Sequence, residues 1–393
     1  METEPSCFPR DLLAQVPKAR LNYFQTYIMA HPRLVAAKDS VVDAIEARAP
    51  NSLVLLVGPT GVGKTALRQK VEQVLTSSML PDLQSDRARI PVVSLECKAS
   101  ESGSFKWRDH FRRLLLEMQE PLVDYKLSPK APAHFSEREK FIPAARAAGY
   151  EYHHAVECAL RFRRPAAVLL DEAQHLARMA SGRRLSDQLD VIKSLANCTQ
   201  TVHVLLGTYE LLAFRNLSGQ LSRRSIVIDF PRYRADDPQD RKVFQTILRS
   251  FERQLPVPEP PDLMSHWEYL YERSIGCVGI LKDWLMRALA VAVKQNRATL
   301  TVRDLHAQEL SAIQCDKILS EALEGEMALN EEPAARTRLR TRLGLSCRED
   351  GQPIRPKAET TPMRKGRIKP GQRHPTRDPV GQPLAIHATI QAL

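Results

Sequence analysis

The most specific pattern in the chain is a glycine-rich run that ends in a lysine and a threonine. It reads Gly58-Pro59-Thr60-Gly61-Val62-Gly63-Lys64-Thr65 and follows the apolar stretch from Leu53 to Val57. Glycines permit a tight turn in which successive backbone N–H groups face one anion, and a helix that begins near Lys64 adds its positive dipole end. The run therefore predicts a nucleotide site, in which Lys64 contacts the β- and γ-phosphates and the Thr65 hydroxyl holds Mg²⁺.

A second pattern places two adjacent carboxylates at the end of an apolar run. Residues Ala166 to Leu170 are apolar, and Asp171 and Glu172 follow them. We expect Asp171 to anchor Mg²⁺ through water and Glu172 to orient or deprotonate the attacking water, because phosphoryl transfer depends on positioning and charge stabilisation. The alternative is that both carboxylates only cap the following helix. Together with the glycine-rich run, the pair favours a Mg²⁺-dependent ATP hydrolase.

Three further side chains stand where they could act on the phosphates. Thr208 follows the apolar run Val202 to Leu206 and is predicted to contact the γ-phosphate or the lytic water. The guanidinium of Arg223, or of its neighbour Arg224, is predicted to contact the ATP that is bound to a second subunit. Lys282 lies one turn into a helix that is predicted to start within Gly276 to Lys282, and it could fold over the phosphates when a lid closes. A basic surface turn and a solvated helix face are the alternatives for the arginine and the lysine.

Short apolar runs that alternate with helical patterns must position these residues. The alternation implies a parallel sheet covered by helices on both faces, with ligands beyond the carboxyl ends of the strands. Five strands are predicted: Leu53–Val57, Ile90–Leu95, Ala166–Leu170, Val202–Leu206 and Ile226–Phe230.

Flanking segments differ from this core and predict four regions, 1–50, 51–236, 237–328 and 329–393. The first is helical, with a break at His31-Pro32-Arg33, and the third contains only helical patterns, opened by a cap at Asp236-Asp237-Pro238. From Glu331 the chain is basic, rich in proline and poor in aromatic residues, so we expect a disordered tail that cannot offset its ordering entropy. Residues 119–143 are expected to form a long loop or insertion.

Composition narrows the partners and the compartment. The chain has 57 Lys and Arg against 46 Asp and Glu, a net charge of +11, which favours a polyanion such as nucleic acid. Its seven cysteines form no C-x-x-C pair, which argues against a zinc ribbon and a secreted disulfide framework. Neither a signal peptide nor an apolar run of about 18 residues is visible. We therefore expect a soluble, cytoplasmic protein without a membrane partner.

Several motifs in a fixed order carry a resemblance to a known family. They are His31-Pro32-Arg33, Leu169 to Leu176, Leu206-Gly207-Thr208, Ser222-Arg223-Arg224 with Phe230 to Tyr233, and Gly279 to Leu285. Over roughly residues 20 to 300 the chain resembles AAA+ ATPases, and more narrowly the TniB/TnsC family of transposition regulators of bacterial elements. The chain departs from the pattern at Lys282, where many AAA+ lids present arginine.

The resemblance implies a fold, an assembly and a set of partners. The fold would be an AAA+ P-loop core with a small α-helical lid. The protein would assemble into ATP-dependent rings or filaments on duplex DNA, receive a target-selection protein, and recruit or activate a transposase.

A basic cluster after the second predicted strand is the candidate DNA surface. It comprises Lys98, Lys106, Arg108, Arg112 and Arg113, the last four around a short helix that holds Trp107 and Phe111. Positions 108 and 112 share one helix face. In a ring of subunits such a cluster would follow the phosphate backbone and give salt-sensitive, sequence-neutral affinity. The alternative is an ordinary solvated helix face.

Other functions remain open. The run Glu172-Ala173-Gln174-His175 resembles a superfamily-two helicase motif, but those enzymes need two tandem nucleotide cores and one phosphate loop is visible. A replication initiator or helicase loader shares the core and the helical lid. Initiators usually append a winged-helix DNA reader, and the pattern after residue 300 does not predict one. A third possibility is an ATP-binding scaffold that hardly turns over.

Overall fold

The computed structural model describes residues 7–47, 53–99, 105–125, 144–178, 183–215, 225–330 and 333–345. Contacts between residues divide the chain into two compact units, Met1–Asn330 and Glu331–Leu393. The first unit contains the sheet and almost all of the described helices. The boundaries that the sequence predicts at residues 50, 236 and 328 stay predictions.

Five parallel strands form the sheet and confirm the five predicted apolar runs. They lie in the order β2-β3-β4-β1-β5, which places β4 between the strand before the glycine-rich run and the strand before the carboxylates. Because parallel strands end at one edge, all three strand ends meet there. Their bounds are β1 Leu53–Val57, β2 Val92–Glu96, β3 Ala167–Asp171, β4 Val202–Gly207 and β5 Ser225–Asp229.

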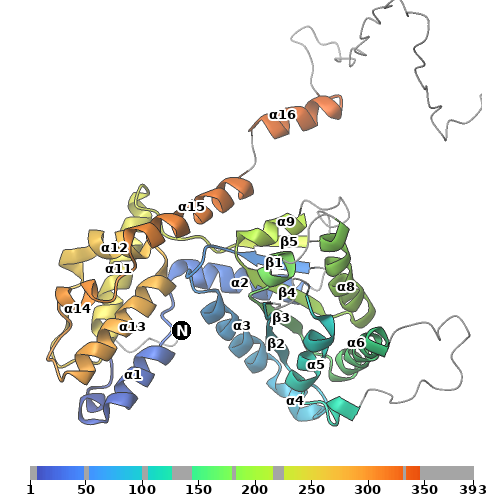
Figure 1. Ribbon diagram of the computed structural model, residues 1–393, viewed down its shortest axis with the longest axis horizontal. Coiled ribbons are helices and arrows are strands. Elements are labelled where there is room, and N and C mark those ends of the chain that lie inside the picture. The colour runs from blue at the N-terminus through green and yellow to red at the C-terminus, as the bar shows by residue number, and fades with distance from the viewer. Residues whose placement is uncertain are drawn as a thin grey trace, which may run out of the picture. The chain divides into compact units, whose positions relative to one another are not determined.

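Alternate side chains of each strand enter two hydrophobic clusters on opposite faces of the sheet. Leu53, Leu55 and Val57 pack with α5 (Trp107–Glu117), α6 (Ala144–Arg163) and α8 (Arg183–Thr199). Val54 and Leu56 pack with α2 (Pro32–Glu46) and α3 (Lys64–Ser78). Figure 1 shows α3 on one side of the strands and α6 and α8 on the other. Both faces are covered, as the sequence predicts, so the strand ends are left as the binding edge.

A second group of helices follows the sheet and has its own core. α1 (Pro17–Thr26), α11 (Pro238–Gln254), α12 (Trp267–Ser274), α13 (Val278–Lys294) and α14 (Val302–His306) share one cluster around the buried Trp284. The Trp284 indole N–H donates to the Leu305 carbonyl at 2.8 Å. Asp237 caps α11 by accepting from the Gln239 N–H, which confirms the predicted helix start. In the described stretch 230–330 every regular element is a helix.

Helix α15 (Ala312–Leu329) joins this helical group to the sheet. The Arg232 guanidinium and the Glu326 carboxylate form an ion pair at 2.9 Å, with side chains 8% and 15% exposed. A Cβ added at Gly325 would lie 2.1 Å from the ring of Tyr209, which begins the short helix η4 (Tyr209–Leu211) directly after β4. α15 therefore packs against the end of β4 so closely that position 325 has room only for glycine.

The remaining elements are short, and one of them departs from the prediction. Pro333–Arg342 forms helix α16, where the sequence predicts disorder from Glu331; proline at the first helical position and Ala, Leu and Arg after it favour a helix. Residues 346–393 and 126–143 lie outside the described part of the chain. The other elements are η1 (Arg10–Ala14), α4 (Leu80–Ser85), η2 (Val123–Tyr125), α7 (Gln174–Arg178), α9 (Leu212–Arg215) and η5 (Met264–His266).

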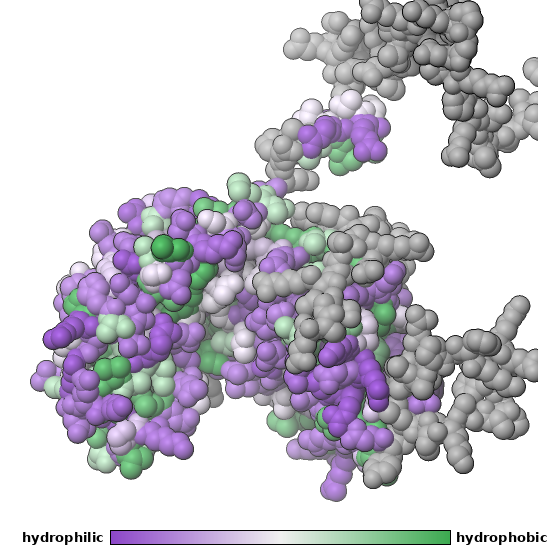
Figure 2. Space-filling view, viewed as in Figure 1, coloured by the Kyte–Doolittle hydropathy of each residue, from purple (hydrophilic) through white to green (hydrophobic). Residues whose placement is uncertain are grey.

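The surface carries scattered apolar residues among polar ones. Figure 2 shows hydrophilic residues over most of the described atoms on the visible face. Met327 and Ile313 of α15 are among the exposed apolar side chains. Within the described residues, no helix has the length and apolar content that crossing a bilayer requires.

Buried histidines predict a loss of stability in mild acid. Burial is the main cause that lowers the pKa values of His31, His110 and His203 to about 4, 3 and 4. In the unfolded chain these histidines have a pKa near 6.5, so as the pH falls they are protonated in the unfolded state before they are protonated in the folded state. Their contribution to the free energy of unfolding is therefore complete above pH 6.5 and is lost as the pH falls toward 4. We expect urea denaturation to show the unfolding free energy falling by up to about 1.4 kcal/mol per pH unit for each histidine.

A matched variant separates this effect from carboxylate titration. His110 lies among the rings of Phe105, Trp107 and Phe111, so His110→Phe keeps an aromatic side chain and removes one titrating group. The pH dependence should become shallower between pH 6.5 and 4. A slope equal to that of the wild type would contradict a neutral His110 in the native protein.

Candidate nucleotide site

The glycine-rich run forms a tight loop between β1 and α3. Gly61 and Gly63 adopt φ values of +73° and +114°, the left-handed region that side chains with a Cβ disfavour. A Cβ at Gly58 would lie 2.4 Å from the carbonyl oxygen of Phe230 at the end of β5. Helix α3 begins at Lys64. The strand, loop and helix thus stand as the sequence predicts for a phosphate cradle.

Lys64 is a buried cation that has no directly paired carboxylate among the described residues. Its Nζ donates to the carbonyl oxygens of Gly58 and Pro59, at 3.1 and 2.9 Å, and the residue is 7% exposed. Burial lowers the Lys64 pKa, while the charges of Glu172 and Asp171 partly raise it. Two neutral carbonyls accept from two of the three ammonium N–H groups and bring no negative charge against the buried cation. A polyphosphate that replaced them would supply that charge, so the loop fits a nucleotide.

Asp171 is already in contact with a cation from the chain itself. Its Oδ1 accepts from the Glu172 N–H at 2.9 Å and its Oδ2 accepts from Arg68 Nε at 3.2 Å. Arg68 also bonds Glu72 and Ser94. It lies four residues after Lys64 and therefore on the same face of α3. Sequence reasoning did not select Arg68, although this spacing from Lys64 was a usable signal.

The donors predicted for Mg²⁺ are a hydroxyl, Thr65, and the carboxylate of Asp171. Oxygen ligands of this kind suit a hard cation. In the described part of the chain, no group of three or more His, Cys, Asp or Glu side chains is placed to hold a metal ion alone. The residues present therefore fit an ion whose remaining ligands are phosphate oxygens and water molecules.

Glu172 and Thr208 are linked through a buried glutamine that the sequence analysis gave no role. Gln174 is 3% exposed; its Nε2 donates to Glu172 Oε2, and its Oε1 accepts from the Thr208 N–H at 3.2 Å. The Thr208 hydroxyl is buried without a hydrogen-bond partner among the described residues. Thr208 is among the residues that line a cavity of about 410 Å³, together with Pro59, Thr60 and residues of α15. The unpartnered hydroxyl thus belongs to a residue in the wall of a cavity beside the loop.

Helix α13 begins directly on the glycine-rich loop. The Ile280 N–H donates to the Gly61 carbonyl at 3.0 Å, and a Cβ at Gly279 would lie 2.4 Å from the same oxygen. Lys282, two residues further on, donates from Nζ to the Gln25 carbonyl at 2.8 Å. Its side chain therefore faces the end of α1 and not the loop. Burial lowers the Lys282 pKa.

Two motifs that are far apart in sequence meet beside the site. His31 Nδ1 and the Tyr233 hydroxyl lie 2.9 Å apart, and the His31 ring stacks on Phe230. Arg33 forms an ion pair with Asp240 and lies over the Tyr233 ring. These contacts tie the N-terminal helices to the segment after β5. Arg223 and Arg224 fall within 216–224, outside the described residues.

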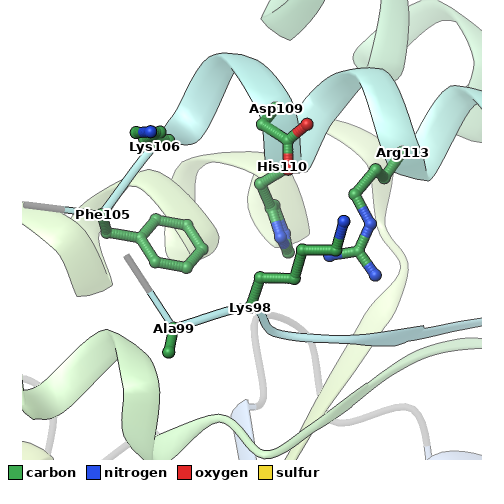
Figure 3. Close-up of a pocket in the computed structure, with 7 residues that line it drawn as sticks. All are labelled: Lys98, Ala99, Phe105, Lys106, Asp109, His110 and Arg113. Carbon is green, nitrogen blue, oxygen red and sulfur yellow. The ribbon is translucent and has the colours of Figure 1, made fainter. Parts of the chain in front are cut away.

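The basic cluster divides into two parts around α5. Lys98, Lys106 and Arg113 line one cavity of about 260 Å³ (Figure 3). Arg112 instead forms an ion pair with Asp124 at 2.6 Å, and with Arg108 it lines a separate hollow. The structure thus brings Lys98 and Lys106 together and places Arg108 and Arg112 apart from them.

The nucleotide site and the basic cluster are neighbours across two strands. Glu96 of β2 pairs with Asp171 of β3, and the Cys97 N–H donates to the Asp171 carbonyl at 2.8 Å. Lys98 is therefore the residue next to Cys97, whose N–H is hydrogen-bonded to the end of β3, the strand that carries Asp171.

Comparison with known proteins identifies the core. Residues 47–214 match a family model described as an AAA domain. No curated protein matches the chain. With this match, the five-stranded parallel sheet and the glycine-rich loop give the fold of an AAA+ P-loop NTPase.

Among the solved structures that are similar to this chain are three proteins from Aeropyrum pernix and Pyrococcus abyssi. The ORC2 protein of Aeropyrum pernix in ADPNP–ADP complexes is 15% identical over 74% of this chain and 72% of that chain, with a TM-score of 0.48. The ORC1 protein of the same organism, in complex with DNA, is 19% identical over 78% and 70%, with a TM-score of 0.46. A Walker-type ATPase of Pyrococcus abyssi is 16% identical over 77% of each chain, with a TM-score of 0.38.

Proposed function

We propose that this protein is an ATP-hydrolysing switch that assembles on duplex DNA and governs where a transposase acts. ATP and Mg²⁺ bind at the glycine-rich loop, and the nucleotide state sets how subunits hold DNA. The partners are duplex DNA, further copies of the chain, a transposase and a target-selection protein of the same element. The motifs shared with the TniB/TnsC family support the transposition part of this proposal.

The observation that carries the proposal is the short path between the nucleotide edge and the basic cluster. The backbone bond from Cys97 to Asp171 joins the two strand ends, and Lys98 follows at once. Any shift of Asp171 on nucleotide binding would move the start of the basic surface. This connection supports our expectation that ATP changes the DNA affinity.

Each residue of the site has a defined task in the proposed hydrolysis. Lys64 exchanges its two carbonyl partners for phosphate oxygens, and the glycine loop offers its N–H groups to them. The Thr65 hydroxyl, and Asp171 through water, would hold Mg²⁺, which would supply positive charge against the phosphates. Glu172 orients the water, the Thr208 hydroxyl contacts the γ-phosphate or that water, and Lys282 approaches the phosphates when the lid closes. Arg223 acts in trans.

A replication initiator or helicase loader remains the alternative, as does a scaffold that hardly turns over. The described stretch from Phe230 to Asn330 contains helices but no strand, and so contains no winged-helix module. Genes beside this one would separate transposition from replication, because a transposase gene next to it supports the former. Phosphate release measured with and without DNA separates either switch from the scaffold.

The test of the proposal is DNA binding with ATP, with ADP and without nucleotide. We expect tight, salt-dependent binding only with ATP. Lys98→Ala with Lys106→Ala should weaken binding to all sequences and reduce the salt slope by about 0.9 for each DNA phosphate that is no longer neutralised. Arg112→Ala should cost less than Lys98→Ala alone, because Asp124 already neutralises the Arg112 guanidinium. DNA affinity that is identical in all three nucleotide states would contradict the switch.

A further inference from the structure

The side chain of Gln174 joins two parts of the site that no sequence motif connects. It is buried at the start of α7 and bridges the Glu172 carboxylate and the Thr208 backbone. The Thr208 N–H is a donor only, so the Gln174 atom that faces it must be the carbonyl oxygen. The amide nitrogen is then left to face Glu172, where it meets an acceptor. Both bonds fix the amide in one orientation.

The end of β4 is shaped to admit this amide. A Cβ added at Gly207 would lie 2.5 Å from Gln174 Oε1 and 3.1 Å from the Gln174 backbone nitrogen. A side chain at position 207 would therefore displace the glutamine. Glycine is required here for the close approach of Gln174.

The Glu172 carboxylate projects from a turn and accepts a hydrogen bond from one described side chain. Glu172 adopts a φ of +52°, an uncommon conformation for a residue with a Cβ, as the chain turns from β3 into α7. In the described part of the chain, Gln174 is the side chain that hydrogen-bonds its carboxylate, and it occupies Oε2. The other carboxylate oxygen, Oε1, is then directed by this bond and is left for water.

We propose that Gln174 is a positioning residue that orients the Glu172 carboxylate and couples its orientation to the end of β4 at Thr208. This inference rests on the proposed hydrolytic role of Glu172. A ligand that contacts the Thr208 hydroxyl moves the same residue whose N–H holds the glutamine. Occupancy of the phosphate site and alignment of the base are thus linked through one amide.

Two substitutions separate the bonds. Gln174→Met keeps the length of the side chain and loses both hydrogen bonds, whereas Gln174→Glu keeps an acceptor for the Thr208 N–H and loses the donor to Glu172. We expect both to lower kcat for ATP hydrolysis by about 10- to 100-fold, the size usual for an outer-shell partner. For Gln174→Met the Kd for a fluorescent ATP analogue should stay near the wild-type value, while the melting temperature falls modestly because the Thr208 N–H loses its acceptor. Gln239→Met, exposed on α11, is the matched control and should hydrolyse normally.

A double-mutant cycle distinguishes positioning from general support of the fold. In the full-length Glu172→Gln protein, Gln174→Met should cause no further loss of kcat, because the group that it orients is already gone. An equal loss in both backgrounds would overturn the inference, as would wild-type kcat in Gln174→Met or a large loss of ATP binding. These outcomes leave the proposed function intact. A wild-type protein that binds ATP but releases no phosphate overturns both.

Discussion

Glu172→Gln should bind ATP and hydrolyse it at least about 100-fold more slowly, the usual cost of losing a general base. The substitution keeps an oxygen that can accept from Gln174, so the local hydrogen bonds survive while the basic group is lost. Because hydrolysis times disassembly in the proposed cycle, complexes with DNA should become long-lived. Single-turnover phosphate release and dissociation from labelled duplex DNA are the two measurements.

The control for this variant is Glu268→Gln, which makes the same chemical change on the exposed face of α12. It should retain wild-type turnover. Rapid dissociation of Glu172→Gln from DNA in the presence of ATP would contradict the proposed link between hydrolysis and release.

Lys64→Ala should abolish ATP binding and, with it, assembly on DNA. The ammonium is the buried charge that faces the loop, and removing it leaves the carbonyls of Gly58 and Pro59 without their donor. Binding of a fluorescent ATP analogue and negative-stain images with duplex DNA and a non-hydrolysable nucleotide are the measurements. Lys242→Ala, exposed on α11, removes the same charge away from the site and should assemble normally.

Stability must be measured beside function for Lys64→Ala. A melting temperature near that of the wild type would show that lost binding reflects the site and not unfolding. Normal filaments in this variant would count against a nucleotide-dependent assembly.

Local patterns were sufficient to predict the sheet and the positions of its motifs. Five apolar runs gave five strands, and Asp237-Pro238 gave the start of α11, because strand burial and helix capping depend on residues near in sequence. The glycine-rich loop was predictable from its motif, because the turn requires left-handed φ values at Gly61 and Gly63. The residues that crowd Gly58 and Gly61, which are Phe230 and Ile280, lie far away in the sequence and were not predictable in this way.

Contacts between distant residues were not predictable in the same way. Arg68 and Asp171 are separated by 103 positions, and Gln174 and Thr208 by 34. Only the strand order β3-β4-β1 brings them to one edge, and no periodicity encodes that order. Lys282 shows the converse case, because its helix position was evident while the partner of its ammonium, Gln25, lies 257 positions away.

The packing of α15 against Tyr209 has a practical consequence. Tyr209 directly follows Thr208, and Glu326 holds the helix in place through its ion pair with Arg232. Met327, on the same helix, is 65% exposed. A fluorophore attached at this exposed position would report on movements of α15. Because α15 packs against Tyr209 at the end of β4, the fluorescence should change when ATP binding or hydrolysis moves that strand end.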